Sequence, residues 1–148
     1  MKAFEFPLRR ALEWRRTRLE MEENKLRQLA ASLEEMALAA VKLDLVKGRA
    51  EADVRQNPVI EACDLWALAA YRLRLNGELQ ALAERRRTCE QQAAAQLGKV
   101  LDAQRQCRLL EKLEGRRQAE WQREADRETE SLAAESFLAR WDRAGKQP

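Results

Sequence analysis

The 148-residue chain contains no histidine, and its five glycines are scattered. Histidine is the commonest metal ligand and titrates near neutral pH, so its absence removes the usual general base. The glycine-rich phosphate loops G-x-x-x-x-G-K-[ST] and G-x-G-x-x-G are missing as well. We therefore expect no enzyme, no cofactor, no metal site and no small-molecule substrate.

Residues that favour strands or a wide core are also scarce. Aromatic residues make up only 5% of the sequence, charged residues make up 36%, and β-branched residues are few. A chain this charged can bury a thin seam between two helices but not a broad core. We therefore predict an all-α fold.

Long apolar runs are absent too. No segment approaches the roughly 20 apolar residues that span a bilayer, and the first eight residues lack the apolar run of a signal peptide. The cysteines are isolated, with no C-x-x-C pair, which is typical of a reducing compartment; they are Cys63, Cys89 and Cys107. We expect a cytoplasmic protein.

What the sequence does contain is a heptad repeat. One apolar series consists of Leu12, Leu19, Leu26, Leu33 and Ala40. A second series interleaves with it and consists of Leu8, Leu29, Met36, Leu43 and Ala50, with Arg15 and Glu22 as charged interruptions. Apolar residues alternately three and four apart place one narrow stripe along a helix, which is the seam of a coiled coil.

The repeat pauses at Asn57-Pro58 and then resumes. Proline disfavours helix in the residue before it, and asparagine tolerates turn geometry. Asn76-Gly77 is an alternative turn. The apolar series holds its spacing straight through that alternative, as Leu68, Leu75, Leu82 and Cys89. A complementary series consists of Leu65, Leu79, Ala93, Val100 and Cys107. We therefore favour the turn at the proline.

The heptads and the turn together predict a long antiparallel two-helix coiled-coil hairpin, one elongated unit over residues 1–148. We expect a helix at about 7–55, a turn at about 56–60 and a longer helix at about 61–143. A turn there lets the first helix cover the second only to about residue 108. We expect Phe4 and Phe6 to fold back on the first turn, and Trp121 either to cap the open end or to contact a partner.

Arginines cluster along both predicted helices, although the net charge is only +3. Glutamates interleave with them at helical spacing, which is typical of a solvated face with i,i+4 ion pairs; a docking surface for an acidic partner is the alternative. A basic leucine zipper has one dense basic block before the zipper. Here Glu13, Trp14 and Glu20 dilute that block, so we expect no nucleic-acid binding.

Three stretches together resemble a known family. The first is the opening Phe4-x-Phe6-x-Leu8 that leads into Leu12. The second, after the turn, consists of Leu65, Leu68, Tyr71, Leu75 and Leu79. The third is Leu109-Leu110-Glu111-Lys112-Leu113-Glu114-x-Arg116-Arg117, followed by Trp121 and Arg127-Glu128. In order and spacing they are similar to the flagellar type III export protein FliJ family. Many members carry an Asp-Glu pair near the end, where this chain has Ser131 to Trp141 instead.

The resemblance implies an antiparallel coiled coil, similar to the rotary shaft of F-type ATPases, inserted into the flagellar export ATPase ring. The implied partners are that ring, the cytoplasmic domain of the export gate and the export chaperones of late substrates. Membrane contact would come only through the gate, at the cytoplasmic face of the inner membrane. The resemblance places gate or chaperone contacts at Trp66, Tyr71 and Arg74. It places ATPase contacts at Arg9, Arg10, Arg116, Arg117 and Trp121. The alternative function is a structural coiled-coil scaffold that dimerises through its C-terminal third.

Overall fold

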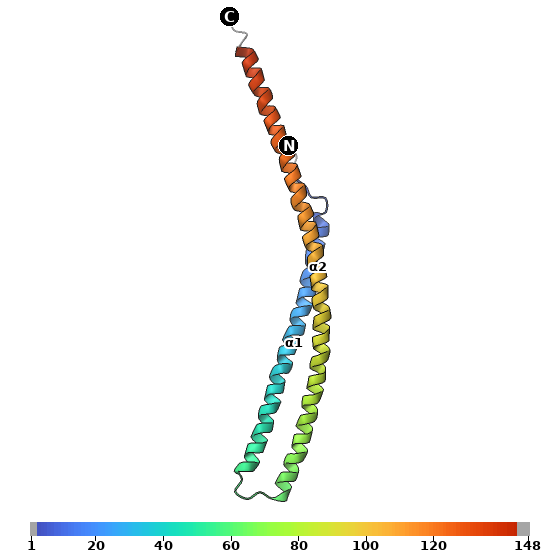
Figure 1. The fold of residues 1–148 in the computed structure, drawn as a ribbon, viewed down its shortest axis with the longest axis vertical. Coiled ribbons are helices and arrows are strands. Elements are labelled where there is room, and N and C mark those ends of the chain that lie inside the picture. Colours follow the sequence, from blue (N-terminus) through green and yellow to red (C-terminus); the bar gives the residue numbers. More distant parts are fainter. Residues whose placement is uncertain (1–2, 145–148) are drawn as a thin grey trace. The chain divides into compact units, whose positions relative to one another are not determined.

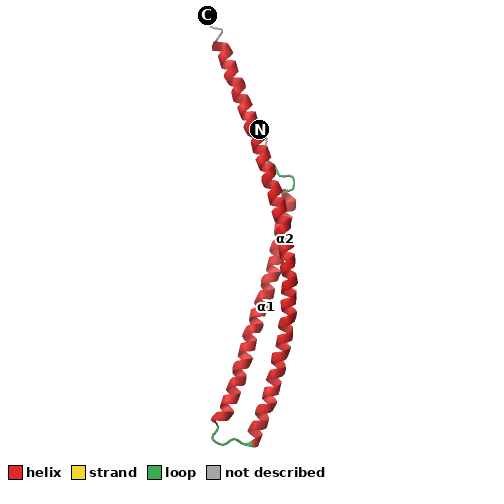
Figure 2. Ribbon diagram, viewed as in Figure 1, coloured by secondary structure: helices red, strands yellow, loops and turns green. Residues whose placement is uncertain are grey.

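The computed structural model describes residues 3–144, which form two helices and no strand (Figures 1 and 2). Helix α1 spans Arg9–Gln56 and helix α2 spans Ala62–Ala144. The predicted all-α hairpin with a longer second helix is therefore confirmed. The pattern of contacts between residues divides the chain into two units. The first combines the N-terminal segment up to Leu19 with the segment from Ala103 onward, and the second is Glu20–Asp102.

The connection between the helices occupies residues 57–61, at the Asn57-Pro58 pair. Helix α2 begins with a carboxylate cap: the Glu61 backbone N–H donates a hydrogen bond to Asp64 Oδ2 at 3.1 Å. A carboxylate in the first turn also opposes the positive end of the helix dipole. Asn76-Gly77 lies within α2 and makes no turn.

Contacts within Glu20–Asp102 establish that the two helices are antiparallel. Positions later in α1 meet positions earlier in α2: Gln96 hydrogen-bonds Glu22, Cys89 hydrogen-bonds Leu29, Asn76 hydrogen-bonds Lys47, and Arg72 forms an ion pair with Glu51. Such opposed pairs hold one register along the seam.

The predicted apolar stripe is the buried seam. Its most buried members are Leu12, Leu75, Cys89, Val100 and Cys107. The exceptions lie at helix ends. Leu8 is 41% exposed because it precedes α1, and Leu65 is 54% exposed in the first turn of α2, opposite the end of α1. Both were expected to lie in the seam, and for both that expectation is wrong.

One seam layer is polar. The Glu22 side chain, expected only as an interruption, is 7% exposed and faces the equally buried Gln96. Gln96 Nε2 donates to the Glu22 backbone carbonyl at 3.0 Å and also to the Glu22 carboxylate. Lys25 Nζ lies 3.2 Å from the same carboxylate. Hydrogen-bonded burial of this kind avoids most of the cost of desolvating a charge.

The N-terminal segment follows α2 instead of folding back fully on α1. Helix α1 starts at Arg9, whose N–H donates to the Phe6 carbonyl at 3.1 Å. The Phe4 ring lies 6.0 Å from the Trp121 ring of α2, and Phe6 is buried. The expectation that Phe4 packs on the first turn of α1 is therefore wrong, because a large aromatic partner on α2 lies within its reach.

Candidate interaction surfaces

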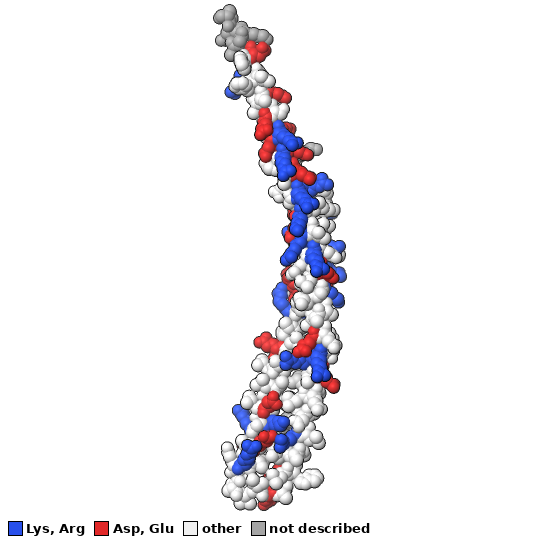
Figure 3. All heavy atoms as spheres, viewed as in Figure 1, with Lys and Arg blue, Asp and Glu red and all other residues white. Residues whose placement is uncertain are grey.

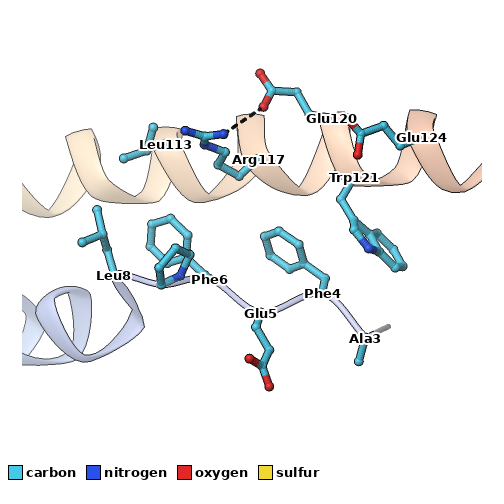
Figure 4. A pocket seen from close by; sticks show the side chains of 11 residues that line it. Ala3, Phe4, Glu5, Phe6, Leu8, Leu113, Arg117, Glu120, Trp121 and Glu124 are labelled. Carbon is cyan, nitrogen blue, oxygen red and sulfur yellow. Dashed lines mark ion pairs between the residues drawn. The ribbon is translucent and has the colours of Figure 1, made fainter. Parts of the chain in front are cut away.

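A groove of about 610 Å³ lies between the N-terminal segment and α2. Figure 4 shows Phe4 and Phe6 pointing from the extended segment towards the helix, with Trp121 and Leu113 on the other side. The N-terminal segment can lie along α2 because α1 begins only at Arg9, so Phe4, Phe6 and Pro7 are outside the helix.

The N-terminal groove also has a charged edge. Arg117, Glu120 and Glu124 line it, and Arg117 Nη1 lies 3.7 Å from Glu120 Oε2. Both side chains of that pair are more than half exposed, so the pair contributes little to stability and its charges remain available. Arg116, the neighbour of Arg117, is exposed but does not line the groove.

Arg9 and Arg10 lie at a second hollow of the same unit, together with Glu5 and Glu13. Both arginines are exposed. Of the five residues that the family resemblance assigns to ATPase contacts, the structure brings Arg117 and Trp121 to one groove. It brings Arg9 and Arg10 to the other hollow, and the segment from Glu5 to Pro7 lines both.

Trp66, Tyr71 and Arg74 lie on the first turns of α2, in the Glu20–Asp102 unit. Trp66 is 82% exposed, whereas Tyr71 lines a hollow near the turn. Arg74 Nε lies 3.2 Å from Glu78 Oε1. Five helical positions separate Trp66 from Tyr71, which places them on different faces of the helix. The three residues therefore do not form one surface.

An exposed apolar residue that the heptad pattern does not predict lies near Trp66. Leu73 follows Trp66 by two helical turns, shares its face and is 76% exposed. On α1, a second apolar stripe has spacings of three and four residues but is exposed, whereas the seam is buried. It consists of Leu38, Val41 and Leu45. The signal that could have found both was large apolar residues outside the heptad series.

The part of the hairpin near the turn is also poor in charge. Residues 36–83 include 12 charged residues in 48, against 41 in the other 100. In Figure 3 the surface towards the turn is mostly uncharged, with a few Lys, Arg, Asp and Glu side chains. Exposed apolar side chains with few charges mark a surface suited to protein contact.

The end of α2 presents a further apolar group. Leu132, Phe137, Leu138 and Trp141 are each more than half exposed. The rings of Phe137 and Trp141 lie 6.3 Å apart in an edge-to-face arrangement. Because they contact each other one helical turn apart, they form a single aromatic patch on an otherwise charged helix.

The cysteines separate into two kinds of site. Cys63 is exposed, whereas Cys89 and Cys107 are buried in the seam. Burial raises the pKa of the Cys107 thiol, and the nearby Glu111 carboxylate adds to this effect. Within residues 3–144, no group of three potential metal ligands occurs and no helix is long and apolar enough to cross a membrane.

No family model matches the chain, and neither the curated proteins nor the solved structures include a significant match.

Proposed function

We propose that this chain is a component of the flagellar type III protein export apparatus, acting as a coiled-coil stalk of the export ATPase ring and as an escort for export chaperones. The observation that carries the proposal is the hairpin itself: a thin seam with a longer second helix and charged outer faces. The order of the three family-like stretches supports it. A narrow helical pair of this kind can enter the pore of a ring and contact successive subunits through its outer surface.

The ATPase contacts in this proposal lie in and beside the N-terminal groove and at its neighbouring hollow. Arg116 and Arg117 are exposed on α2, and Arg9 and Arg10 are exposed at the start of α1. Arginines of this kind can form charge-assisted hydrogen bonds to carboxylates of a ring subunit.

The test is stimulation of ATP turnover by the cognate export ATPase. Arg116→Glu with Arg117→Glu should reduce stimulation at least about tenfold, because two contacts change from attraction to repulsion. Arg49→Glu with Arg55→Glu is the matched control, with the same charge change near the turn. Undiminished stimulation by the first double variant would remove Arg116 and Arg117 from the interface.

Gate or chaperone contacts would use Trp66, and the exposed Leu73 beside it strengthens that assignment. Trp66→Ala should weaken binding to the gate cytoplasmic domain about tenfold or more, as expected for an exposed aromatic anchor. Ala69→Ser, on the same part of α2, is the control. Equal affinities of the Trp66 variant and the native chain would assign the gate contact elsewhere.

A structural scaffold that dimerises through its C-terminal third is the second candidate, and the aromatic patch at Phe137 and Trp141 favours it. That function requires a stable dimer in sedimentation, and truncation after Leu110 should return it to monomer. The stalk proposal requires a monomer under the same conditions. Sedimentation of the native chain therefore separates the two functions.

A further inference from the structure

Trp121 is a seam residue that α1 does not cover. It follows the buried Cys107 by two heptads and so occupies the same seam position on α2. Arg16 Nη2 lies 2.9 Å from Glu111 Oε1. Because the helices are antiparallel, Arg9, the first residue of α1, lies level with a position about seven residues beyond Glu111. Trp121 lies further along α2, so α1 leaves this layer open.

The extended N-terminal segment covers Trp121 in place of α1. Phe4 is half-buried, Glu5 is exposed and Phe6 is buried, so alternate side chains face α2, as in an extended chain. The Phe4 and Trp121 rings lie 6.0 Å apart, and Figure 4 shows them between the segment and the helix. Trp121 is half-buried. The other tryptophans are all more than half exposed; they are Trp14, Trp66 and Trp141. We call residues 3–6 the N-terminal strap.

The N-terminal strap is held by its rings and not by its backbone. Within residues 3–144, the backbone of residues 3–5 forms no hydrogen bond with other backbone groups, and the Phe6 carbonyl accepts one from the Arg9 N–H at 3.1 Å. An aromatic pair favours its contact only roughly two- to tenfold beyond the area that it buries. Lifting the strap therefore gives up ring contacts with α2 but no backbone hydrogen bond to it. A competing segment with similar rings restores those contacts.

The N-terminal strap also leaves part of its site unfilled. The groove of about 610 Å³ remains between the strap and α2, with Leu113, which is 36% exposed, on the helix side. Protein interiors are normally filled to high density, so a segment with larger apolar side chains fills this groove better than the strap does. The strap keeps its place because it is tethered, which gives it an effective concentration of about millimolar.

We propose that the α2 surface at Leu113 and Trp121 is a docking site for an extended segment of a partner protein with two aromatic side chains at alternate positions. In the free chain the N-terminal strap occupies this site, and the partner segment displaces it. The chemistry of the partner follows from the strap, because Phe4-x-Phe6 is itself seated on the surface. The site is independent of the proposed export function, since it follows from the contacts of the strap alone.

The first experiment measures how well the strap covers Trp121. The full chain with Trp14→Phe, Trp66→Phe and Trp141→Phe, all at exposed positions, keeps Trp121 as its single tryptophan. In this background Phe4→Ala should raise the acrylamide quenching constant at least about twofold, because the indole loses its aromatic cover. Phe137→Ala, in the exposed aromatic patch, is the control and should leave quenching unchanged. Equal quenching with and without the Phe4 ring would overturn the proposal.

The second experiment measures docking in trans. The probe is a fluorescein-labelled peptide with the sequence of residues 1–8, and the readout is fluorescence anisotropy with the full-length chain. The peptide should bind the Phe4→Ala, Phe6→Ala double variant at least about tenfold more tightly than the native chain, because the tethered competitor is lost. Phe4→Ala alone, which keeps the buried Phe6, should show an intermediate affinity, and circular dichroism should show native helicity for both variants.

Two controls identify the contact. A peptide with alanine at both aromatic positions should not bind, and Trp121→Ala added to the Phe4→Ala variant should abolish binding. Equal affinity for the native chain and the variants, no binding to any of them, or binding that survives Trp121→Ala would each overturn the proposal. A native dimer that Phe4→Ala with Phe6→Ala dissolves would also overturn it, because the strap would then join two copies instead of covering its own α2.

Discussion

The seam near the turn and the seam near the chain ends follow the same heptad rule but are filled differently. Near the turn, a hollow opens beside the half-buried Ala50, and Leu65 is more than half exposed. In the unit that holds both ends, Leu12 is 2% exposed and Phe6 is buried. Periodicity thus places residues at an interface, whereas their size and the elements around them decide whether the interface is closed.

This difference separates a stabilising region from a contact region. Closed layers remove apolar surface from water, at about 25 cal/mol per Å², and so hold the helices together. Open layers contribute less to stability but retain surface for a partner. We therefore expect stability to depend chiefly on the closed layers and binding chiefly on the open ones.

The largest predicted effect compares one substitution in the two regions. Leu12→Ala should lower the free energy of unfolding by about 3 kcal/mol, because a buried leucine is removed and leaves a cavity. Leu65→Ala should cost less than about 1 kcal/mol, because Leu65 is already half in water. Urea denaturation followed by circular dichroism measures both. Equal losses would contradict the contrast between the regions.

The second prediction concerns the polar layer inside the closed seam. Gln96→Ala should cost about 2 kcal/mol, because the buried Glu22 carboxylate loses the amide that donates to it. Glu22→Leu with Gln96→Leu should recover that loss or exceed the native stability, since a packed apolar layer avoids desolvating the charge. Denaturation midpoints of the native, single and double variants decide this. A double variant less stable than Gln96→Ala would contradict the prediction that an apolar layer can replace the polar one.

A smaller effect is expected at the N-terminal groove. Phe4→Ala should lower the free energy of unfolding by about 1 kcal/mol, which is the usual contribution of an aromatic pair. A double-mutant cycle with Trp121→Ala isolates the ring contact, and the two losses should be less than additive. Phe137→Ala, which lies in the exposed aromatic patch, is the control. Strict additivity at Phe4 and Trp121 would show that the rings do not interact in solution.

The smallest predicted effect is a dependence on alkaline pH. Because folding raises the pKa of the Cys107 thiol, the folded state keeps its proton to higher pH than the unfolded state. The contribution to stability is complete below the ordinary thiol pKa of 9.0 and is lost as the pH rises through the raised value. Unfolding free energies between pH 8 and about 10.5 should fall less steeply for Cys107→Val than for the native chain. Cys63→Ser should keep the native slope.

Much of the fold was predictable because the information is local. Seven-residue spacing identifies a seam without knowledge of the partner helix, and Asn57-Pro58 identifies the turn without knowledge of the packing. Heptads that pass through Asn76-Gly77 similarly argued against a turn there. For the candidate surfaces, the sequence indicated Trp121 as an aromatic residue on a charged helix, and the family resemblance indicated Trp66, but neither gave a reason to pair Trp121 with Phe4.

The sequence by itself determined an all-α hairpin with a thin seam, a turn at Pro58 and buried seam cysteines, because each depends only on spacing along one helix. Tertiary structure decided which residues meet: Glu22 with Gln96, Phe4 with Trp121, and Lys47 with Asn76. These contacts depend on the register between segments distant in sequence. Register is set by all seam layers together, so no single stretch of sequence contains it.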